Sequence, residues 1–216
     1  MSTLTLYHGT KDINFKPDFN FNNLNNDYGK GLYTTPYKEL GKEWSYASYT
    51  SGEQGYVFEY TIDVTGLNIL DFTSLDSLHW LAELAYNRKI NAYGKEVLTD
   101  NIKRFIQKYK IDTRCYDIII GYRADNSYFS YAEDFLSGLI YRGTVDKALR
   151  NGNLGIQVFI KSPKAFSILH QNSVPEAVDK KYAGFYSKRD KLAREKYISD
   201  KRNQSSRLKQ TIKDFI

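Results

Sequence analysis

A glycine turn that runs directly into a strand constrains this chain more than any other stretch. Residues Asp27 to Thr35 read Asp-Tyr-Gly-Lys-Gly-Leu-Tyr-Thr-Thr. The two glycines, Gly29 and Gly31, allow positive φ and let another group come close to the backbone. The aromatic and β-branched residues after them favour a short strand led by Tyr33. The segment therefore predicts a tight turn that feeds a strand.

An apolar stretch that ends in a histidine and a glycine precedes this turn and reads Leu6-Tyr7-His8-Gly9-Thr10. Together and in this order, the two stretches resemble the ADP-ribosyltransferases of the diphtheria-toxin and poly(ADP-ribose)-polymerase branch. Members of that branch carry a histidine-glycine pair on the first strand and a glycine-lysine-glycine-x-tyrosine segment on the next. A third polar residue, usually glutamate, lies on a later strand.

Two further segments extend the resemblance to a bacterial subgroup of unknown function within that superfamily. They are Tyr116 to Gly121, followed by Asp125, and Gln157 to Lys161. The resemblance covers about Leu4 to Leu169. A Gly-x-Gly turn alone is not specific, and this one lacks the third glycine of a dinucleotide-binding turn. The ordered set of four segments carries the resemblance.

Length and composition set limits on the class of protein. A chain of 216 residues is one domain, or a domain with an appendage, and can bury a proper core. It has no apolar run near the roughly 20 residues that span a bilayer, and its start is unlike a signal peptide, so we expect a cytoplasmic protein without membrane contact. The single cysteine, Cys115, excludes an internal disulfide, and with only three histidines we expect no metal site.

The positive charge is concentrated in the C-terminal part of the chain. The net charge is +6, and from Asp179 onward twelve Lys and Arg stand against five Asp and Glu. Tyrosines interleave with these cations, a pattern that suits a phosphate backbone with stacked bases. A helix with one apolar stripe packed on the body or on a partner explains the same pattern and is favoured. Nucleic acid is thus preferred only slightly over protein as a partner.

Hydrophobic periodicity predicts a mixture of strands and helices. We expect strands over 3–8, 32–35, 56–64, 116–121 and 155–161, and helices over 37–49 and 131–150, with a helical insertion at about 71–112. Ser173 followed by Glu176 matches a capping box, which predicts that a basic helix starts there. This gives a domain over 1–170 and a basic helical extension over 171–216.

The resemblance implies that NAD is the substrate and that His8, Tyr33 and Gln157 form the catalytic set. His8 would hydrogen-bond the adenosine ribose, and the Gly9 backbone would reach the carboxamide. Tyr33 would stack on the nicotinamide ring. Trp44, eleven residues later, stands where relatives have a second stacking residue. Thr10 and Gly31 would also bind NAD, and Asp125 is a candidate on the acceptor side.

Gln157 departs from the usual glutamate of the superfamily. A glutamine side chain can accept a hydrogen bond from a ribose hydroxyl, but it cannot oppose a developing positive charge. Chain elongation is therefore disfavoured, and single transfer or weak activity is expected. Gly155 stands two residues earlier, so the pattern of arginine-modifying relatives is missing.

Each residue also has a structural interpretation. A single strand histidine is more often structural than catalytic, Tyr33 is one of nineteen tyrosines, and Asp125 with Asn126 suits a turn. Other interpretations of the whole chain stay open. They are an inactive module that binds NAD, ADP-ribose or a partner protein, an NAD glycohydrolase, and a nucleic-acid-binding regulator.

The sequence therefore predicts an α+β protein: an ADP-ribosyltransferase-like split β-sandwich with a helical insertion and a C-terminal basic helix. The resemblance implies a mono-ADP-ribosyltransferase that modifies a macromolecule, either nucleic acid or protein. Similar bacterial proteins tend to be intracellular toxins or defence effectors with a neutralising partner. The apolar stripe of the C-terminal helix is the candidate docking site for such an antitoxin.

Overall fold

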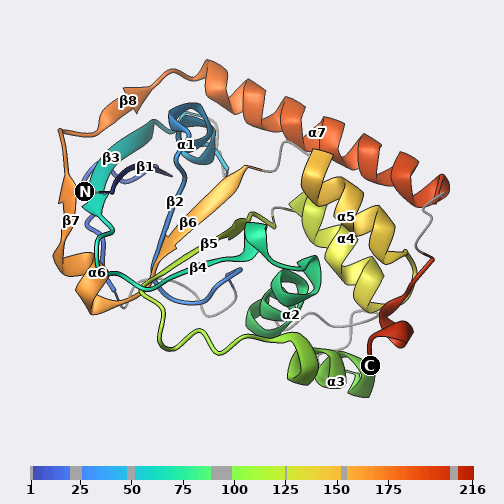
Figure 1. Cartoon of the computed structure of the whole chain (residues 1–216). Helices are drawn as coiled ribbons and strands as arrows, with labels where there is room; N and C mark the ends of the chain where they lie inside the picture. Colours follow the sequence, from blue (N-terminus) through green and yellow to red (C-terminus); the bar gives the residue numbers. More distant parts are fainter. Residues whose placement is uncertain are drawn as a thin grey trace.

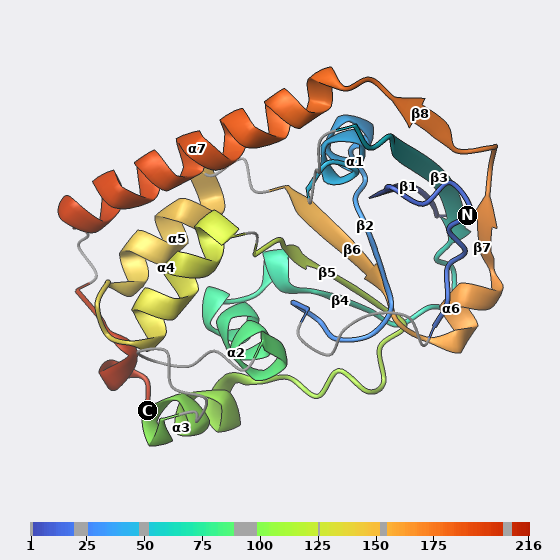
Figure 2. The same ribbon diagram turned by 180° about the vertical axis from the view of Figure 1, so that it is seen from behind.

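The computed structural model describes residues 2–19, 26–47, 52–88, 99–124, 126–151, 155–204 and 209–216. These residues form two β-sheets, a group of helices, and one long helix near the C-terminus (Figures 1 and 2). The protein is therefore an α+β protein, as the sequence predicted.

The first sheet is organised around β3, which pairs with strands on both of its edges. Its strands are β1 (Thr3–Thr10), β3 (Gly55–Asp63), β7 (Leu169–Gln171) and β8 (Glu176–Val178). All of the pairings are antiparallel, and β7 and β8 share one edge of β3. Phe58, Tyr60 and Ile62 are all buried, and their spacing of two places them on one face of the strand.

The second sheet has the strand order β2-β6-β5-β4. Its strands are β2 (Leu32–Thr34), β6 (Ile156–Ile160), β5 (Ile118–Tyr122) and β4 (Ile69–Asp71). The pairs β2 with β6 and β5 with β6 are antiparallel, whereas β4 with β5 is parallel. The two central strands, β5 and β6, are almost continuously apolar, because a different layer covers each of their faces.

The two sheets enclose a common core and meet at one point. A buried cluster contains residues from both: Leu6, Leu32, Phe58, Tyr60, Ile62, Ile118, Val158, Ile160 and Ala165. Tyr7 of β1 and Thr35, just after β2, exchange two backbone hydrogen bonds of 2.8 and 2.9 Å. Strands β1 and β2 therefore lie side by side at the junction of the sheets.

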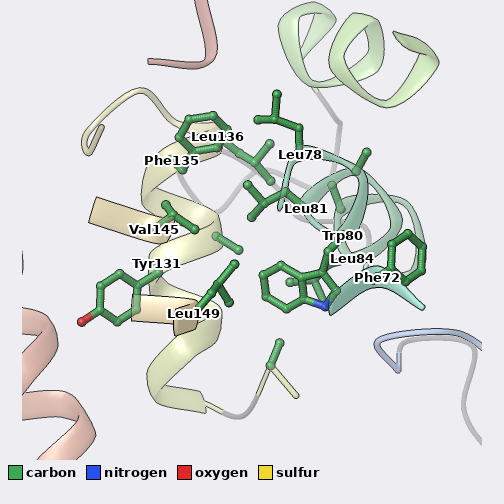
Figure 3. Close-up of a cluster of buried hydrophobic side chains, with 14 of the residues drawn as sticks. Phe72, Leu78, Trp80, Leu81, Leu84, Tyr131, Phe135, Leu136, Val145 and Leu149 are labelled. Carbon is green, nitrogen blue, oxygen red and sulfur yellow. The ribbon is translucent and has the colours of Figure 1, made fainter. Parts of the chain in front are cut away.

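Helices cover the outer face of the second sheet (Figure 1). They are η1 (Phe72–Ser74), α2 (Ser77–Arg88), α3 (Asp100–Tyr109), α4 (Asn126–Leu136) and α5 (Arg142–Asn151). Their apolar side chains form a second buried cluster, which also contains Tyr28 of the glycine turn and Phe159 of β6. Figure 3 shows Trp80 and Leu81 of α2 facing Phe135 and Leu149 of the α4 and α5 pair.

One continuous helix was predicted over 131–150, but the structure has two. Helix α4 ends at Leu136, and Gly138 follows with a φ of 74°. The backbone N–H of Leu139 donates to the carbonyl of Asp134 at 2.7 Å, which closes the end of α4. A glycine in the left-handed region with such a bond is a usual helix stop. The prediction missed this stop because apolar residues continue on both sides of it.

The predicted helix start at Ser173 and Glu176 is wrong, because Glu176 lies in β8. The Glu176 backbone pairs with Val57 of β3. Its carboxylate binds Lys38 at 2.7 Å and Lys42 at 3.1 Å, and both lysines belong to α1 (Lys38–Trp44). Tertiary partners therefore replace the local capping contacts. The two short strands β7 and β8 were not predicted.

The C-terminal helix α7 (Lys181–Arg202) packs on α1 at one end and on α4 at the other (Figures 1 and 2). Arg189 donates to Glu43 of α1 at 2.5 Å, and Tyr131 of α4 donates to Asp200 at 2.9 Å. Its predicted apolar stripe is divided, since Ala193 is buried while Leu192 is 55% exposed. The remaining short helices are α6 (Pro163–Ser167) and η3 (Ile212–Asp214).

Among the described residues, no helix combines the length and the apolar character needed to span a bilayer.

Candidate functional site

Three sequence segments that carry candidate residues lie on neighbouring strands. His8 is on β1, Tyr33 is on β2, and Gln157 is on β6. The Tyr7 and Thr35 bridge joins β1 to β2, and Tyr33 pairs with Phe159 of β6. Gln157 is two residues from Phe159, so both side chains project from the same face of β6. The fold thus brings together segments that are far apart in the sequence.

His8 is held at the junction of the two sheets by its ring. Its Nδ1 lies 2.8 Å from the Tyr33 carbonyl oxygen, and its ring stacks on Phe15 at 4.4 Å. Burial lowers the pKa of His8, although the bond to the Tyr33 carbonyl opposes this. Because a carbonyl can only accept, Nδ1 carries the proton of the neutral ring, and Nε2 is left as an acceptor. An acceptor at Nε2 matches a ligand hydroxyl.

Gly9 is required by the packing of α1 against β1. A Cβ at this position would lie 2.0 Å from the Gly41 carbonyl oxygen and 2.6 Å from the Ser45 backbone nitrogen. The close approach of α1 therefore explains on structural grounds why position 9 is glycine, which the sequence did not reveal. Thr10 follows, and its hydroxyl accepts a hydrogen bond from the backbone of Asp12 at 3.3 Å.

The glycine turn has the backbone conformation that its sequence predicted. Gly29 has a φ of 89° and Gly31 a φ of 150°. A Cβ at Gly31 would lie 2.3 Å from the carbonyl oxygen of Ile160, so β6 is the group that comes close. Only glycine combines this conformation with this proximity.

Tyr33 stabilises the same turn with its hydroxyl. That hydroxyl donates to the Gly29 carbonyl at 2.8 Å and accepts from the Tyr28 backbone at 3.0 Å. Its ring lies 4.6 Å from the Phe159 ring, and burial raises the pKa of Tyr33 well above its usual range. The side chain therefore stays neutral and fixed, with only part of its surface open to a ligand.

Gln157 is buried, with only 5% of its surface exposed. Its side-chain nitrogen donates to Asp27 Oδ2 at 3.2 Å. Its side-chain oxygen, Oε1, is buried and has no hydrogen-bond partner among the described residues. A buried acceptor without a partner costs about 1–3 kcal/mol. A ligand donor at this atom would recover that free energy.

Asp27 and Arg88 are site residues that sequence reasoning missed. Asp27 is 3% exposed, and its carboxylate accepts from Arg88 Nε at 2.7 Å and from the Ala124 backbone at 2.9 Å. Burial raises the pKa of Asp27, while Arg88 and the Ala124 N–H oppose this shift. In sequence, an aspartate before glycines indicates only a turn. No local signal pairs it with an arginine on α2.

Trp44 is the last residue of α1 and is half-buried. Its indole nitrogen is buried and has no hydrogen-bond partner among the described residues. The guanidinium of Arg123 lies 4.7 Å from the centre of its ring. Arg123 directly follows β5, whose Gly121 pairs with Gln157. A cation thus connects Trp44 to the end of β5, the strand that pairs with the Gln157 strand β6. Asp125 lies outside the described residues.

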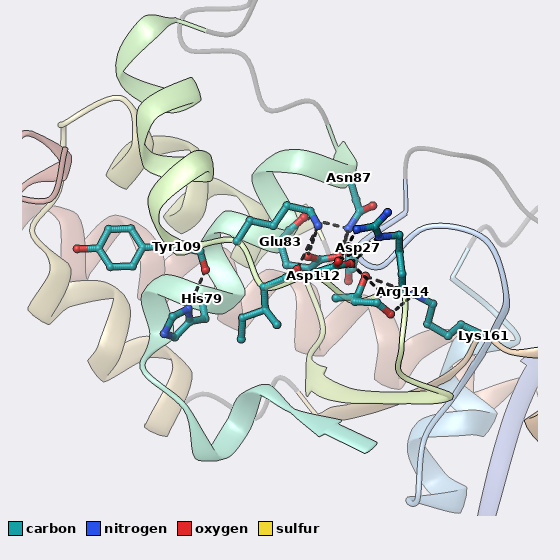
Figure 4. A network of polar contacts seen from close by, with 11 residues as sticks. Asp27, His79, Glu83, Asn87, Tyr109, Asp112, Arg114 and Lys161 are labelled. Carbon is teal, nitrogen blue, oxygen red and sulfur yellow. Dashed lines mark hydrogen bonds and ion pairs between the residues drawn. The ribbon is translucent and has the colours of Figure 1, made fainter. Parts of the chain in front are cut away.

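A buried polar network continues from Asp27 into α2 (Figure 4). Asn87 donates to the Asp27 carbonyl at 3.1 Å and to Glu83 Oε1 at 2.8 Å. Glu83 is 2% exposed, and burial raises its pKa although Lys110, at 3.6 Å, opposes the shift. These contacts fix α2 against the glycine turn. The described residues hold no cluster of side chains that could bind a metal ion.

A separate pocket of about 590 Å³ lies beside α3. Its lining residues are Tyr86, Ile106, Gln107, Lys110, Ile111, Asp112, Thr113 and Arg114. Two of its cations have partners, Arg114 with Asp112 and Lys110 with Glu83. None of the residues implicated by the sequence lines this pocket.

The fold and the site define an α+β protein with two packed sheets and a polar constellation on three adjacent strands. Residues 4–171 match the model of a family described as "Protein of unknown function (DUF3990)", and the chain belongs to this family. No curated protein and no solved structure gives a significant match. The matched range contains every candidate site residue and ends before β8 and α7.

Proposed function

We propose that the protein is a mono-ADP-ribosyltransferase that cleaves NAD and transfers ADP-ribose to a macromolecule. One observation carries this proposal: three residues from separate sequence segments converge on adjacent strands. His8 Nδ1 lies 2.8 Å from the Tyr33 carbonyl oxygen, and Gln157, on the strand next to Tyr33, presents an Oε1 that has no partner in the described part of the chain. In this proposal, the two packed sheets form the split β-sandwich of the ADP-ribosyltransferase superfamily.

The proposed chemistry requires hydroxyl acceptors and a surface for a flat ring. His8 Nε2 would accept from the adenosine ribose, and Gln157 Oε1 from the nicotinamide ribose. Tyr33 and Trp44 would contact the nicotinamide ring through their aromatic faces. Gly9, Thr10 and Gly31 would lie along the dinucleotide. His8 Nε2 and Gln157 Oε1 are both acceptors, so they suit a ligand rich in hydroxyl donors.

The reaction breaks the bond between nicotinamide nitrogen and ribose C1′. A nucleophile of the acceptor forms a new bond to C1′ and loses its proton, while nicotinamide leaves with the bonding electron pair. The protein contributes mainly by positioning these groups. Gln157 carries no charge to stabilise a cationic ribose, so a single slow transfer is the expected activity. Asp125 remains the proposed acceptor-side residue.

Two observations favour a second candidate, a module that binds NAD or ADP-ribose without chemistry. Gln157 is 95% buried, and the Tyr33 hydroxyl is already engaged by the glycine turn. Such a module would bind the dinucleotide and release no nicotinamide. An NAD glycohydrolase would instead release free ADP-ribose without an acceptor.

The biological role proposed here follows from the same resemblance. The protein would act in the cytoplasm as a toxin or defence effector, and its acceptor would be nucleic acid in slight preference to protein. Phe185 and Leu192 of α7 are 49% and 55% exposed, and they would contact a neutralising antitoxin. Their spacing of seven residues places both on one side of the helix.

The test is incubation with NAD labelled on its adenylate part, together with a bacterial lysate. Transfer predicts a labelled macromolecule whose label is lost on nuclease or protease treatment, according to the acceptor. His8→Ala and Gln157→Ala should abolish or strongly reduce labelling. His170→Ala and Gln171→Ala are matched controls, because both residues are exposed on β7.

Each alternative gives a different result in this assay. Free nicotinamide and ADP-ribose without labelled product would indicate hydrolysis. Binding of NAD without nicotinamide release would indicate the non-catalytic module. Equal labelling by His8→Ala and the unsubstituted protein would refute the proposed site.

A further inference from the structure

Asp27 lies directly behind the Gln157 amide in the interior of the protein. Both residues are at least nine-tenths buried, and Asp27 Oδ2 is 3.2 Å from Gln157 Nε2. The same carboxylate binds Arg88 and the Ala124 backbone N–H. The carboxylate is therefore surrounded by donors from α2, from the end of β5, and from β6.

This arrangement fixes the direction of the Gln157 amide. A carboxylate only accepts hydrogen bonds, so the NH₂ group of the amide has to face it. The amide oxygen is then turned away from Asp27, and it has no partner among the described residues. If the amide were rotated by half a turn, two acceptors would face each other. A neutral residue at position 27 would remove this preference.

The charge of Asp27 is compensated by Arg88. The Arg88 Nη2 and Asp27 Oδ1 atoms are 2.5 Å apart, and the pair lies largely out of water. A ligand beyond Gln157 therefore experiences a pair of opposite charges instead of a single carboxylate.

We propose that Asp27 is a positioning residue that holds Gln157 Oε1 toward a hydroxyl donor of the ligand. This inference rests on the proposed function, because the ligand is taken to be NAD. It also accounts for a glutamine at position 157. A carboxylate there would meet Asp27 at hydrogen-bond distance, whereas the amide supplies the donor that Asp27 accepts.

The rival interpretation is that Asp27 only stabilises the fold. Asn87 provides the matched control for this possibility, because it belongs to the same network but does not contact Gln157. It donates to the backbone carbonyl of Asp27 and to Glu83. Asn87→Ala should lower the melting temperature and leave the affinity for NAD unchanged.

The test is a double-mutant cycle on the Kd for NAD, measured by calorimetry on the full chain. We expect Asp27→Asn alone, and Gln157→Ala alone, each to weaken binding about tenfold, the value of one hydrogen bond of about 1.4 kcal/mol. In the Gln157→Ala background, Asp27→Asn should change the Kd less than about threefold. If Asp27→Asn changed the Kd by the same factor in the unsubstituted protein and in Gln157→Ala, the positioning role would be overturned and the proposed function would stand. No binding of NAD by the unsubstituted protein would overturn both.

A second measurement needs no substitution at Asp27 and covers the case in which Asp27→Asn does not fold. Gln157→Ala identifies the Gln157 side-chain amide signals in a nitrogen-15 NMR spectrum. We expect these protons to exchange with water at least about tenfold more slowly than those of Gln171, because the Gln157 amide is buried against a carboxylate, whereas the Gln171 amide donates to the Ser173 carbonyl at the exposed surface. Equal exchange rates for Gln157 and Gln171 would refute the proposed contact and the inference.

Discussion

Replacing Gln157 by glutamate tests the buried contact directly. The substitution keeps the shape of the side chain and exchanges a hydrogen-bond donor for a second carboxylate. That carboxylate would face Asp27 across the 3.2 Å that now separates Gln157 Nε2 from Asp27 Oδ2. Two like charges at this distance repel by about 5 kcal/mol at an effective dielectric constant of about 20.

Protonation sets an upper limit on this destabilisation. One carboxyl can take up a proton, which removes the repulsion and restores a donor between the two groups. With an ordinary glutamate pKa of about 4.3, the proton costs about 3.7 kcal/mol at about pH 7 and about 1 kcal/mol at about pH 5. The loss of stability should therefore be about 3–4 kcal/mol near neutrality and should shrink by about 2–3 kcal/mol on acidification.

The linkage between proton binding and folding sets the direction in which the stability of Gln157→Glu changes with pH. The folded variant holds one proton more than its unfolded chain near neutrality, so its stability relative to the parent rises as the pH falls. Urea unfolding of both proteins at the two pH values measures this difference. Gln171→Glu, on an exposed edge strand, is the control and should change stability by less than about 0.5 kcal/mol. A loss that does not depend on pH, or no loss at all, would refute the buried contact.

Three further predictions concern packing and the C-terminal helix. Gly9→Ala should destabilise the fold by about 3 kcal/mol or more, because its Cβ would overlap the Gly41 carbonyl of α1. Gly184→Ala, where a Cβ meets no atom within 4 Å, should instead stabilise by about 0.5–1 kcal/mol in thermal unfolding. Arg189→Ala should cost about 1–3 kcal/mol at neutral pH, because it removes the guanidinium that pairs directly with buried Glu43. Burial already raises the pKa of Glu43 and Arg189 opposes this, so the loss should diminish at lower pH. A pH-independent loss in urea unfolding would contradict this account of the pair.

The strands with strong local patterns were predictable. The strand predicted over 56–64 corresponds to β3, and the one predicted over 116–121 overlaps β5 (Ile118–Tyr122). Both are marked by alternating or continuous apolar residues, a signal that each segment carries by itself. Strands β7 and β8 were missed because each has three residues, and their pairing with β3 alone makes them strands.

The candidate site was predictable only in part. The order of the histidine-glycine pair, the glycine turn and the later glutamine indicated which segments belong together. The sequence did not show that Gly9 lets α1 pack closely against β1. It also did not show that the Tyr33 hydroxyl stabilises the turn, or that Asp27 binds Arg88. These roles depend on partners that are distant in the chain, and residue type at one position carries no information about such partners.

The sequence alone determined the α+β class, the positions of the longer strands, and the conformation of the glycine turn, because these depend on local periodicity and on the backbone freedom of glycine. The tertiary structure decided what surrounds each site residue. Folding removes Asp27 and Gln157 from water, and a buried polar group must then find its partners within the protein. Asp27 finds Arg88, Ala124 and Gln157, whereas Gln157 Oε1 has no partner among the described residues and marks the place where we propose that a ligand binds.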